Sequence, residues 1–183
     1  MLGDPLEPAE LQRIFDQDIR PYYFPDNLTP ETTPTVVLVG GQPGAGKSQA
    51  TSRIARAYPG IVPLSGDNLR AFHPDYGQLV RDRPLEAGPI LAQATSVWVR
   101  NAIEYAREHR HSLQLEGTFH TPSLTLATAQ RFRDAGFRTE IVALATPRRD
   151  SLIAAAGRYF SEHASGKEPR WTSLEQHDQG WQG

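Results

Sequence analysis

Residues 41–48 read GQPGAGKS and match the pattern G-x-x-x-x-G-K-[ST]. Glycines let the backbone curl so that successive N–H groups point into one concavity, which no Cβ obstructs. The dipole and the unpaired amides of a following helix strengthen the attraction for an anion. The pattern therefore predicts a loop that binds the phosphates of a nucleoside triphosphate. Its members are Gly41, Gln42, Pro43, Gly44, Ala45, Gly46, Lys47 and Ser48.

Lys47 is one of only two lysines in a chain that has 17 arginines. A compact ammonium fits beside the β- and γ-phosphates in a tight loop, where the planar guanidinium of arginine is a poor replacement. The pattern assigns Lys47 to these phosphates and the hydroxyl of Ser48 to Mg²⁺. The alternative is a glycine-rich turn that only caps a helix. Binding alone does not define a reaction, because the same loop serves switches, motors and kinases.

A carboxylate follows the next apolar run, in the stretch PLSGDNLRAFHPDY at 63–76. In small kinases built on such a loop, a carboxylate at this place can accept the proton of an attacking hydroxyl. Asp67 is the candidate, and Arg70 would share its helical face because the two are three positions apart. The alternative is that Asp67 only N-caps a short helix, which would end near His73 and Pro74.

Further charged residues follow the later apolar runs. Glu116 ends the run HSLQLE, where an unpaired buried carboxylate would be costly unless a polar ligand, a metal-held water or an arginine offset that cost. Guanidinium groups from a mobile lid are the usual stabilisers of a transferring phosphoryl group. The lid candidates are Arg148, Arg149, Arg158 and Arg170, and Arg158 and Arg170 could each instead be a surface residue. Arg148 and Arg149 are expected to open a helix and to take no part in the chemistry.

The elements that must position these groups alternate between strands and helices. Apolar, β-branched runs predict strands over 33–40, 61–65, 111–116 and 138–146. Helices are predicted over 48–58, 85–109, 122–136 and 148–163, with Thr121 as an N-cap before Pro122. In the longest helix, the expected buried stripe consists of Ile90, Val97, Ala102 and Tyr105. The order predicts a single-domain α/β fold of the P-loop kinase type, with a mainly parallel sheet and ligands at the carboxyl ends of its strands.

The first 32 residues are expected to precede the main fold as a short amphipathic helix over 8–15 and an extended linker. Three prolines, Pro21, Pro25 and Pro30, interrupt the chain there. Residues 33–183 are then the P-loop kinase domain, with the arginine-bearing lid toward its C-terminal end.

Composition narrows the class of protein. A chain of 183 residues can bury one substantial core. The absence of cysteine excludes disulfides, thiolate metal sites and cysteine nucleophiles. A net charge of −2 gives no sign of the basic face of a nucleic-acid binder. The sequence has neither an 18-residue apolar run nor a secretory signal, so we expect a cytoplasmic protein without a membrane partner.

Three stretches, GGQPGAGKS, SGDNLRAFHPDY and LEGTFHTP, occur in an order and spacing that resembles the zeta toxin family of bacterial toxin–antitoxin systems. The resemblance implies a P-loop kinase that uses ATP or GTP with Mg²⁺. It implies phosphorylation of UDP-N-acetylglucosamine, or a related UDP-amino sugar, at the sugar 3′-hydroxyl, with a product that blocks cell-wall synthesis. It also implies inhibition by a small helical antitoxin, for which the N-terminal helix could form a surface or could be simple packing.

The resemblance also assigns roles to residues of this chain. It makes Asp67 the general base, Lys47 the phosphate clamp and Ser48 the magnesium ligand. It selects Arg158 and Arg170 as the lid arginines. The expected substrate-binding residues are Asp67, Arg70, Glu116, Thr118 and His120.

One departure from the family pattern leaves the acceptor open. In the family, EGT is commonly followed by Leu-Arg, whereas this chain has Phe119 and His120. Imidazole is shorter than guanidinium and cannot form its two-pronged clamp on a phosphate. Family members also usually run on through another strand and helix. Without these elements the pocket for the nucleotide base would be incomplete, so we expect weak selectivity between ATP and GTP. The alternatives are a P-loop kinase for another hydroxyl, such as that of an antibiotic or a nucleotide ribose, and a nucleotide-binding regulatory module without catalysis.

Overall fold

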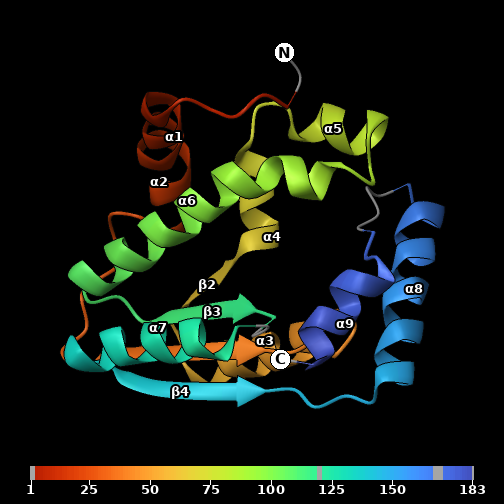
Figure 1. Cartoon of the computed structure of the whole chain (residues 1–183). Helices are drawn as coiled ribbons and strands as arrows, with labels where there is room; N and C mark the ends of the chain where they lie inside the picture. Colours follow the sequence, from red (N-terminus) through yellow and green to blue (C-terminus); the bar gives the residue numbers. More distant parts are fainter. Residues whose placement is uncertain (1–2, 119–120, 167–170, 183) are drawn as a thin grey trace.

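A four-stranded parallel sheet in the order β2-β3-β1-β4 forms the centre of the protein (Figure 1). The structure is a computed structural model, and it describes residues 3–118, 121–166 and 171–182. The strands are β1 (Thr35–Gly40), β2 (Val62–Ser65), β3 (Leu113–Gly117) and β4 (Arg138–Ala143). This confirms the predicted α/β fold, and each strand lies inside or within one residue of its predicted range.

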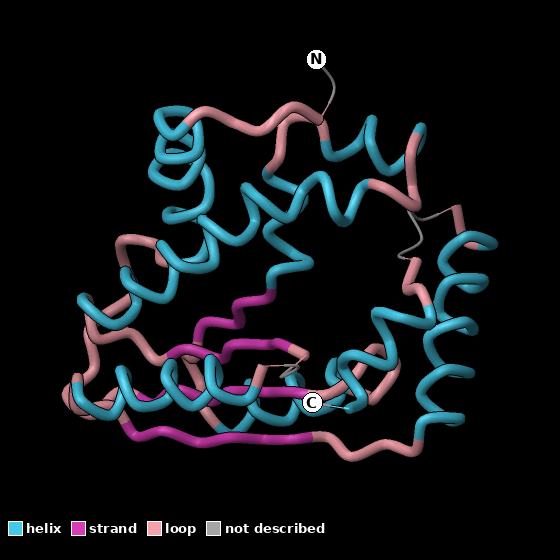
Figure 2. The backbone as a smooth tube through the Cα atoms, in the orientation of Figure 1, coloured by secondary structure: helices cyan, strands magenta, loops and turns pink. Residues whose placement is uncertain are grey.

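Helices cover both faces of this sheet, because the central strand is apolar on both. Val36 and Leu38 of β1 pack in the larger core cluster, together with side chains of α6 (Ala87–Glu108) and α7 (Pro122–Asp134). Val37 and Val39 point the other way and pack against α3 (Lys47–Ala57). The tube view in Figure 2 follows these connections from strand to helix. Such two-sided burial explains why the strand is a continuous run of apolar residues.

Further helices lie outside this core, and the one over 76–82 packs against α6 away from the sheet (Figure 1). Helix α8 (Arg148–Ala164) agrees with its predicted range, whereas α5 (Tyr76–Asp82) and α9 (Leu174–Gln182) were not predicted. A short α4 (Gly66–Leu69) continues into the 3₁₀ turn η2 (Arg70–Phe72) after β2. Within the described ranges, no helix combines the length and the apolar character needed to cross a bilayer.

The buried face of α6 differs from the predicted one. Of the expected stripe only Ala102 is fully buried. Trp98 instead forms the centre of this face, is 0% exposed, and donates from Nε1 to the carbonyl of Leu11 at 2.9 Å. The small side chains Ala94 and Ala106 lie on the same face. The stripe is shifted because Trp98 packs against the N-terminal helix, a long-range contact that the hydrophobicity pattern of α6 does not reveal. Thr121 precedes α7 as predicted but makes no side-chain capping bond.

The N-terminal segment is helical for longer than predicted. Helix α1 (Pro8–Ile14) continues through the π-helix η1 (Phe15–Ile19) into α2 (Arg20–Tyr23). The break expected at Pro21 does not occur, and Pro21 lies in the first turn of α2, directly after the π-helix. Side chains of this segment belong to the same core cluster as β1. The boundary between residues 32 and 33 stays a prediction.

Two buried histidines make stability depend on pH. Burial lowers the pKa of His73, while the nearby Asp75 acts in the opposite direction. Burial, and next the neighbouring His109, lower the pKa of His111. Both rings therefore take up a proton at lower pH in the folded chain than in the unfolded chain, and His73 uses its Nδ1 to accept a hydrogen bond from the backbone N–H of Asp75 at 3.1 Å.

We expect the free energy of unfolding to fall as pH is lowered from about 7.5 to about 5.5. Below the ordinary histidine value of about 6.5, the unfolded chain takes up protons that the folded chain resists, so acid favours unfolding. Urea midpoints across this range measure the effect. The double variant His73→Gln, His111→Gln is expected to have a flatter profile than the parent chain. An unchanged or rising parent midpoint on acidification would contradict this assignment.

Candidate active site

The candidate site residues follow strand ends that are level with one another. In the register of the sheet, Glu116 of β3 pairs with both Val39 of β1 and Ser65 of β2, and Gly40 pairs with Gly117. The glycine-rich loop follows β1, Asp67 follows β2 and Thr118 follows β3. The parallel sheet thus brings these three segments to one edge, at the arrowheads in Figure 1.

The glycine-rich loop has the backbone geometry that its sequence demands. Gly46 is the N-cap of α3 with a φ of 93°, a left-handed conformation that favours glycine. Gly44 has a φ of 80°, and a Cβ there would lie 2.0 Å from the backbone oxygen of Ser151 on α8. A side chain at position 44 is therefore excluded twice, by backbone conformation and by packing. The loop leads directly into the N-terminus of α3, whose first N–H groups suit an anion.

Lys47 lies across this loop. Its Nζ donates to the carbonyl of Gly41 at 2.7 Å and to that of Gln42 at 3.2 Å. Ser48 is exposed in the first turn of α3. The ammonium thus stands at the loop itself, where phosphate oxygens could take over from the carbonyls. Within the described ranges, no group of three or more His, Cys, Asp or Glu could hold a metal ion. The exposed hydroxyl of Ser48 is a group that could serve as the protein ligand of a Mg²⁺ bound to nucleotide phosphates.

Asp67 lies in the first turn of α4 and does not cap it. The N-cap is Ser65, and no side-chain capping bond is made there, so the N-cap interpretation of Asp67 is wrong. Asp67 Oδ1 is 3.1 Å from the guanidinium of Arg70, as their spacing predicted. The Asp67 side chain is 42% exposed, which leaves it accessible from solvent. His73 ends the following 3₁₀ turn, as predicted.

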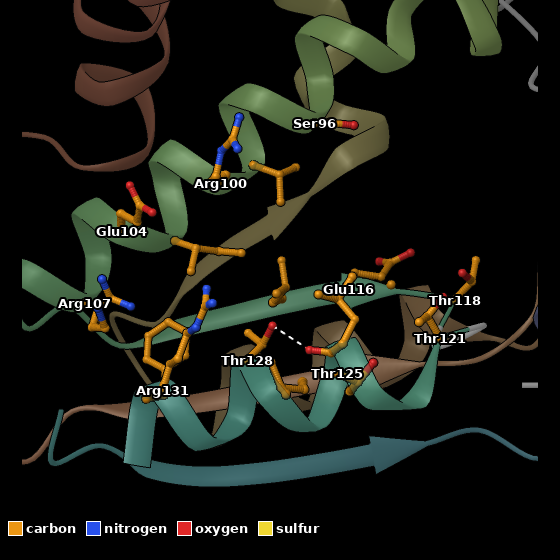
Figure 3. Close-up of a pocket in the computed structure, with 17 residues that line it drawn as sticks. Ser96, Arg100, Glu104, Arg107, Glu116, Thr118, Thr121, Thr125, Thr128 and Arg131 are labelled. Carbon is orange, nitrogen blue, oxygen red and sulfur yellow. Dashed lines mark hydrogen bonds between the residues drawn. The ribbon is translucent and has the colours of Figure 1, made fainter. Parts of the chain in front are cut away.

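A cavity of about 430 Å³ opens between α6 and α7 over β3 (Figure 3). Glu116, Thr118 and Thr121 lie together at the end of the cavity near the end of β3, and Arg107 and Arg131 lie at the opposite end. The cavity is therefore polarised: a carboxylate and hydroxyls lie at one end, and at the other end the guanidinium groups outnumber the single carboxylate of Glu104 beside them. Leucine, isoleucine, valine and phenylalanine side chains line the stretch between.

Sequence reasoning found Glu116 and Thr118 but missed the helical walls of this cavity. A signal was present in the spacing of polar residues on each helix. Polar residues recur at intervals of three or four on each helix, namely Arg100, Glu104 and Arg107 on α6, and Thr125 and Thr128 on α7 together with Thr121 just before it. Each set marks one face of its helix. Nothing in the sequence indicated that the two faces oppose each other.

The ion-pair alternative for Glu116 finds no support in the described part of the chain. No salt bridge between described residues involves this carboxylate, which is half-buried at the cavity wall. A polar ligand or a metal-held water stays the prediction for its position.

The predicted lid arginines are described only in part. Arg158 is half-buried on α8, and its buried Nε has no hydrogen-bond partner among the described residues. Arg170 and His120 lie outside the described residues. Arg148 opens α8 as predicted, and its guanidinium binds the carboxylate of Asp178 on α9 through two contacts of 2.8 Å.

Comparisons with known proteins agree with this architecture. A protein-family model described as Zeta toxin matches residues 23–183. Toxin zeta of Streptococcus agalactiae is 26% identical over 148 residues, which are 80% of this chain and 52% of that protein. Toxin PezT of Streptococcus pneumoniae serotype 4 is 27% identical over 147 residues, which are 79% of this chain and 58% of that protein. The chain thus spans about half the length of these curated relatives.

A solved structure shares the fold. It belongs to work on the PezAT chromosomal toxin–antitoxin system of Streptococcus pneumoniae, and it matches with a TM-score of 0.79 at 22% identity. The match covers 90% of this chain and 67% of the other chain. At this identity the likeness concerns the arrangement of strands and helices.

Proposed function

This chain belongs to the zeta toxin family, and from that membership and the geometry of its site we propose that it is a kinase for UDP-amino sugars. The reaction transfers the γ-phosphate of ATP or GTP to a sugar hydroxyl, the 3′-hydroxyl of UDP-N-acetylglucosamine or a close relative. In a bacterial cytoplasm such a reaction interferes with cell-wall synthesis. A small helical antitoxin is the partner that we propose, since a relative of the same fold comes from a toxin–antitoxin system.

The polarised cavity is the observation that carries the proposed substrate. A UDP-amino sugar has a hydroxyl-bearing ring at one end and a negatively charged diphosphate beside it, followed by the nucleoside. The threonines and Glu116 offer hydrogen bonds to sugar hydroxyls next to the glycine-rich loop. Arg107 and Arg131 offer charge-assisted bonds to phosphate oxygens farther away.

The nucleotide and its metal fit the glycine-rich loop. The backbone amides of the loop and Lys47 would bind the phosphates, and Ser48 would bind Mg²⁺, which supplies charge neutralisation when bound. Asp67 would hold the acceptor hydroxyl and accept its proton as the hydroxyl attacks. Arg158 and Arg170 would stabilise charge on the transferring group. The register of the strands supports these assigned roles, because it brings the loop, Asp67 and the cavity to one edge of the sheet.

Incubation with γ-labelled ATP, Mg²⁺ and a panel of acceptors tests the proposal. We expect label to enter UDP-N-acetylglucosamine or another UDP-amino sugar, and not aminoglycosides, free sugars or nucleoside monophosphates. Label in an antibiotic or a nucleotide ribose instead would replace the proposed acceptor. ATP binding with no labelled product from any acceptor would favour a regulatory module.

Arg131→Gln is expected to raise the KM for the UDP-sugar about tenfold or more, with little change in the KM for ATP. The reason is the loss of one charge-assisted bond to the acceptor, worth about 1.5–3 kcal/mol. Arg133→Gln is the matched control, because Arg133 is exposed on the same helix and does not line the cavity. Equal effects of the two substitutions on the acceptor KM would remove Arg131 from the acceptor site.

A further inference from the structure

A buried polar cluster lies directly behind the glycine-rich loop, at the contact between α8 and α9. Gln42, Ser151 and His177 are 3%, 0% and 0% exposed. His177 Nε2 is 2.8 Å from Ser151 Oγ, and Gln42 Nε2 donates to the same Oγ at 3.2 Å. Helix α9 also touches the loop by packing, because a Cβ on Gly180 would lie 3.3 Å from Cα of Gln42. Figure 1 shows α9 between the end of the sheet and α8.

The ionised carboxylate of Asp178, next to His177, determines which groups donate and which accept in this cluster. The Arg148 guanidinium, and next His177, hold the pKa of Asp178 down at about 2. Asp178 is therefore an ionised acceptor, and His177 must donate to it from Nδ1, at 3.1 Å. With Nδ1 as the donor, Nε2 accepts a hydrogen bond from the Ser151 hydroxyl at 2.8 Å, the shortest contact of that hydroxyl. Gln42 completes the chain by donating to Ser151.

A serine, a histidine and an aspartate in this order also form the nucleophilic triad of many hydrolases. That function is excluded here by burial. Ser151 is 0% exposed, and its oxygen is surrounded by the Gln42 amide, the His177 ring and the backbone of its own helix. No substrate carbonyl can reach it.

The cluster holds the loop from its outer side. The Gln42 amide also donates to the carbonyl of Thr146, and the Thr146 hydroxyl donates to the carbonyl of Ala45 at 2.9 Å. Gly44 lies against the Ser151 carbonyl with no room for a Cβ. The carbonyl of Gln42 in turn accepts from Nζ of Lys47. A displacement of Gln42 would therefore move both the loop backbone and the lysine that faces the phosphates.

We propose that His177 is a positioning residue, which docks α9 on the glycine-rich loop and, through Ser151 and Gln42, keeps that loop in its phosphate-binding form. The proposal rests on the proposed function only in that the loop binds a nucleoside triphosphate. Preorganisation of this kind raises affinity because the loop pays less ordering entropy when the ligand binds. Removal of one buried partner leaves the others unsatisfied, which strains the same cluster.

Two substitutions separate the two contacts of the ring. His177→Gln places an amide near the position of Nε2, within reach of Ser151, whereas His177→Asn places one near Nδ1, within reach of Asp178 only. We expect the Kd for ATP to stay within about threefold of the parent in His177→Gln and to rise about tenfold in His177→Asn. His109→Gln is the control, because His109 is an exposed histidine at the far end of α6 and should leave the Kd unchanged.

The binding titration uses ATP with Mg²⁺ and the full chain, and hydrogen exchange of the 41–46 segment accompanies it. We expect faster exchange of these amides in His177→Asn, with exchange of β3 unchanged. A purely structural role would instead lower the melting temperature of both variants while the folded chains bound ATP like the parent. That result, or equal Kd values for the two variants, would overturn the proposal.

If His177→Asn fails to fold, Ser151→Ala tests the same proposal, because it removes the hydroxyl that His177 contacts. It is expected to raise the Kd for ATP about as much as His177→Asn. Parent-like ATP binding by folded Ser151→Ala would overturn the proposal. Because only ATP binding is measured, a failure of the UDP-sugar assay leaves this result intact, and a failure here leaves the acceptor assignment intact.

Discussion

Lys47→Ala is expected to reduce phosphoryl transfer by at least about 10³-fold while the chain remains folded. Nζ of Lys47 lies within hydrogen-bonding distance of two loop carbonyls, so it stands where β- and γ-phosphate oxygens would bind. Its removal deletes a positive charge at the point where negative charge accumulates during transfer. Labelled product per minute, with the UDP-sugar that works best, measures the loss, and a thermal melt measures the fold.

Two further variants sharpen this prediction. Lys47→Arg keeps the charge but brings a broad planar group into a tight loop, so we expect it to recover little of the activity. Arg56→Ala removes an exposed positive charge from the last turn of the same helix and should leave transfer unchanged. If Lys47→Ala unfolds the chain, the lysine has a structural role in closing the loop. If it transfers phosphate normally, the loop is not the phosphate site.

Asp67→Asn is expected to lower kcat by about 10²- to 10⁴-fold with little change in the KM for ATP. The amide keeps the size of the carboxylate but cannot accept the proton of an attacking hydroxyl. The substitution also removes the ion pair with Arg70 at 3.1 Å, an effect that has to be separated from loss of the base.

Arg70→Gln provides that separation, because it removes the same ion pair and leaves the carboxylate in place. We expect a smaller loss from it, chiefly in the KM for the acceptor. Asp82→Asn is a second control, since it neutralises an exposed carboxylate at the end of α5. Near-full activity of Asp67→Asn would remove it from the role of general base, and equal losses in Asp67→Asn and Arg70→Gln would assign the effect to the ion pair.

The sequence predicted the parts of this site that depend on short segments of chain. The continuous apolar run before Gly41 specified β1, and the glycines with Lys47 specified the loop and the start of α3. Asp67 and Glu116 followed from their places after apolar runs. Each of these predictions needed only a strand, its end and the residues next to it, which is why local patterns sufficed.

Long-range packing accounts for what the sequence did not predict. The cavity forms because a polar face of α6 lies opposite one of α7, and no pattern within either helix specifies its partner. The contact of His177 with Ser151 joins α9 to α8, and no sequence pattern in either helix indicates that the two side chains meet. The stripe of α6 was displaced because Trp98 packs against the N-terminal helix. In each case a distant contact decided the outcome.

The pairing of β3 has a consequence for the folding of active molecules. Apolar and polar residues alternate along this strand in the order Leu113, Gln114, Leu115, Glu116. A slip by one residue against β1 or β2 would bring Leu115 level with Ser65 and Val39 in place of Glu116. Such a molecule could still be compact, yet it would present a leucine where the carboxylate belongs. The specific activity of a refolded sample would therefore count the fraction of chains in which this strand has paired correctly.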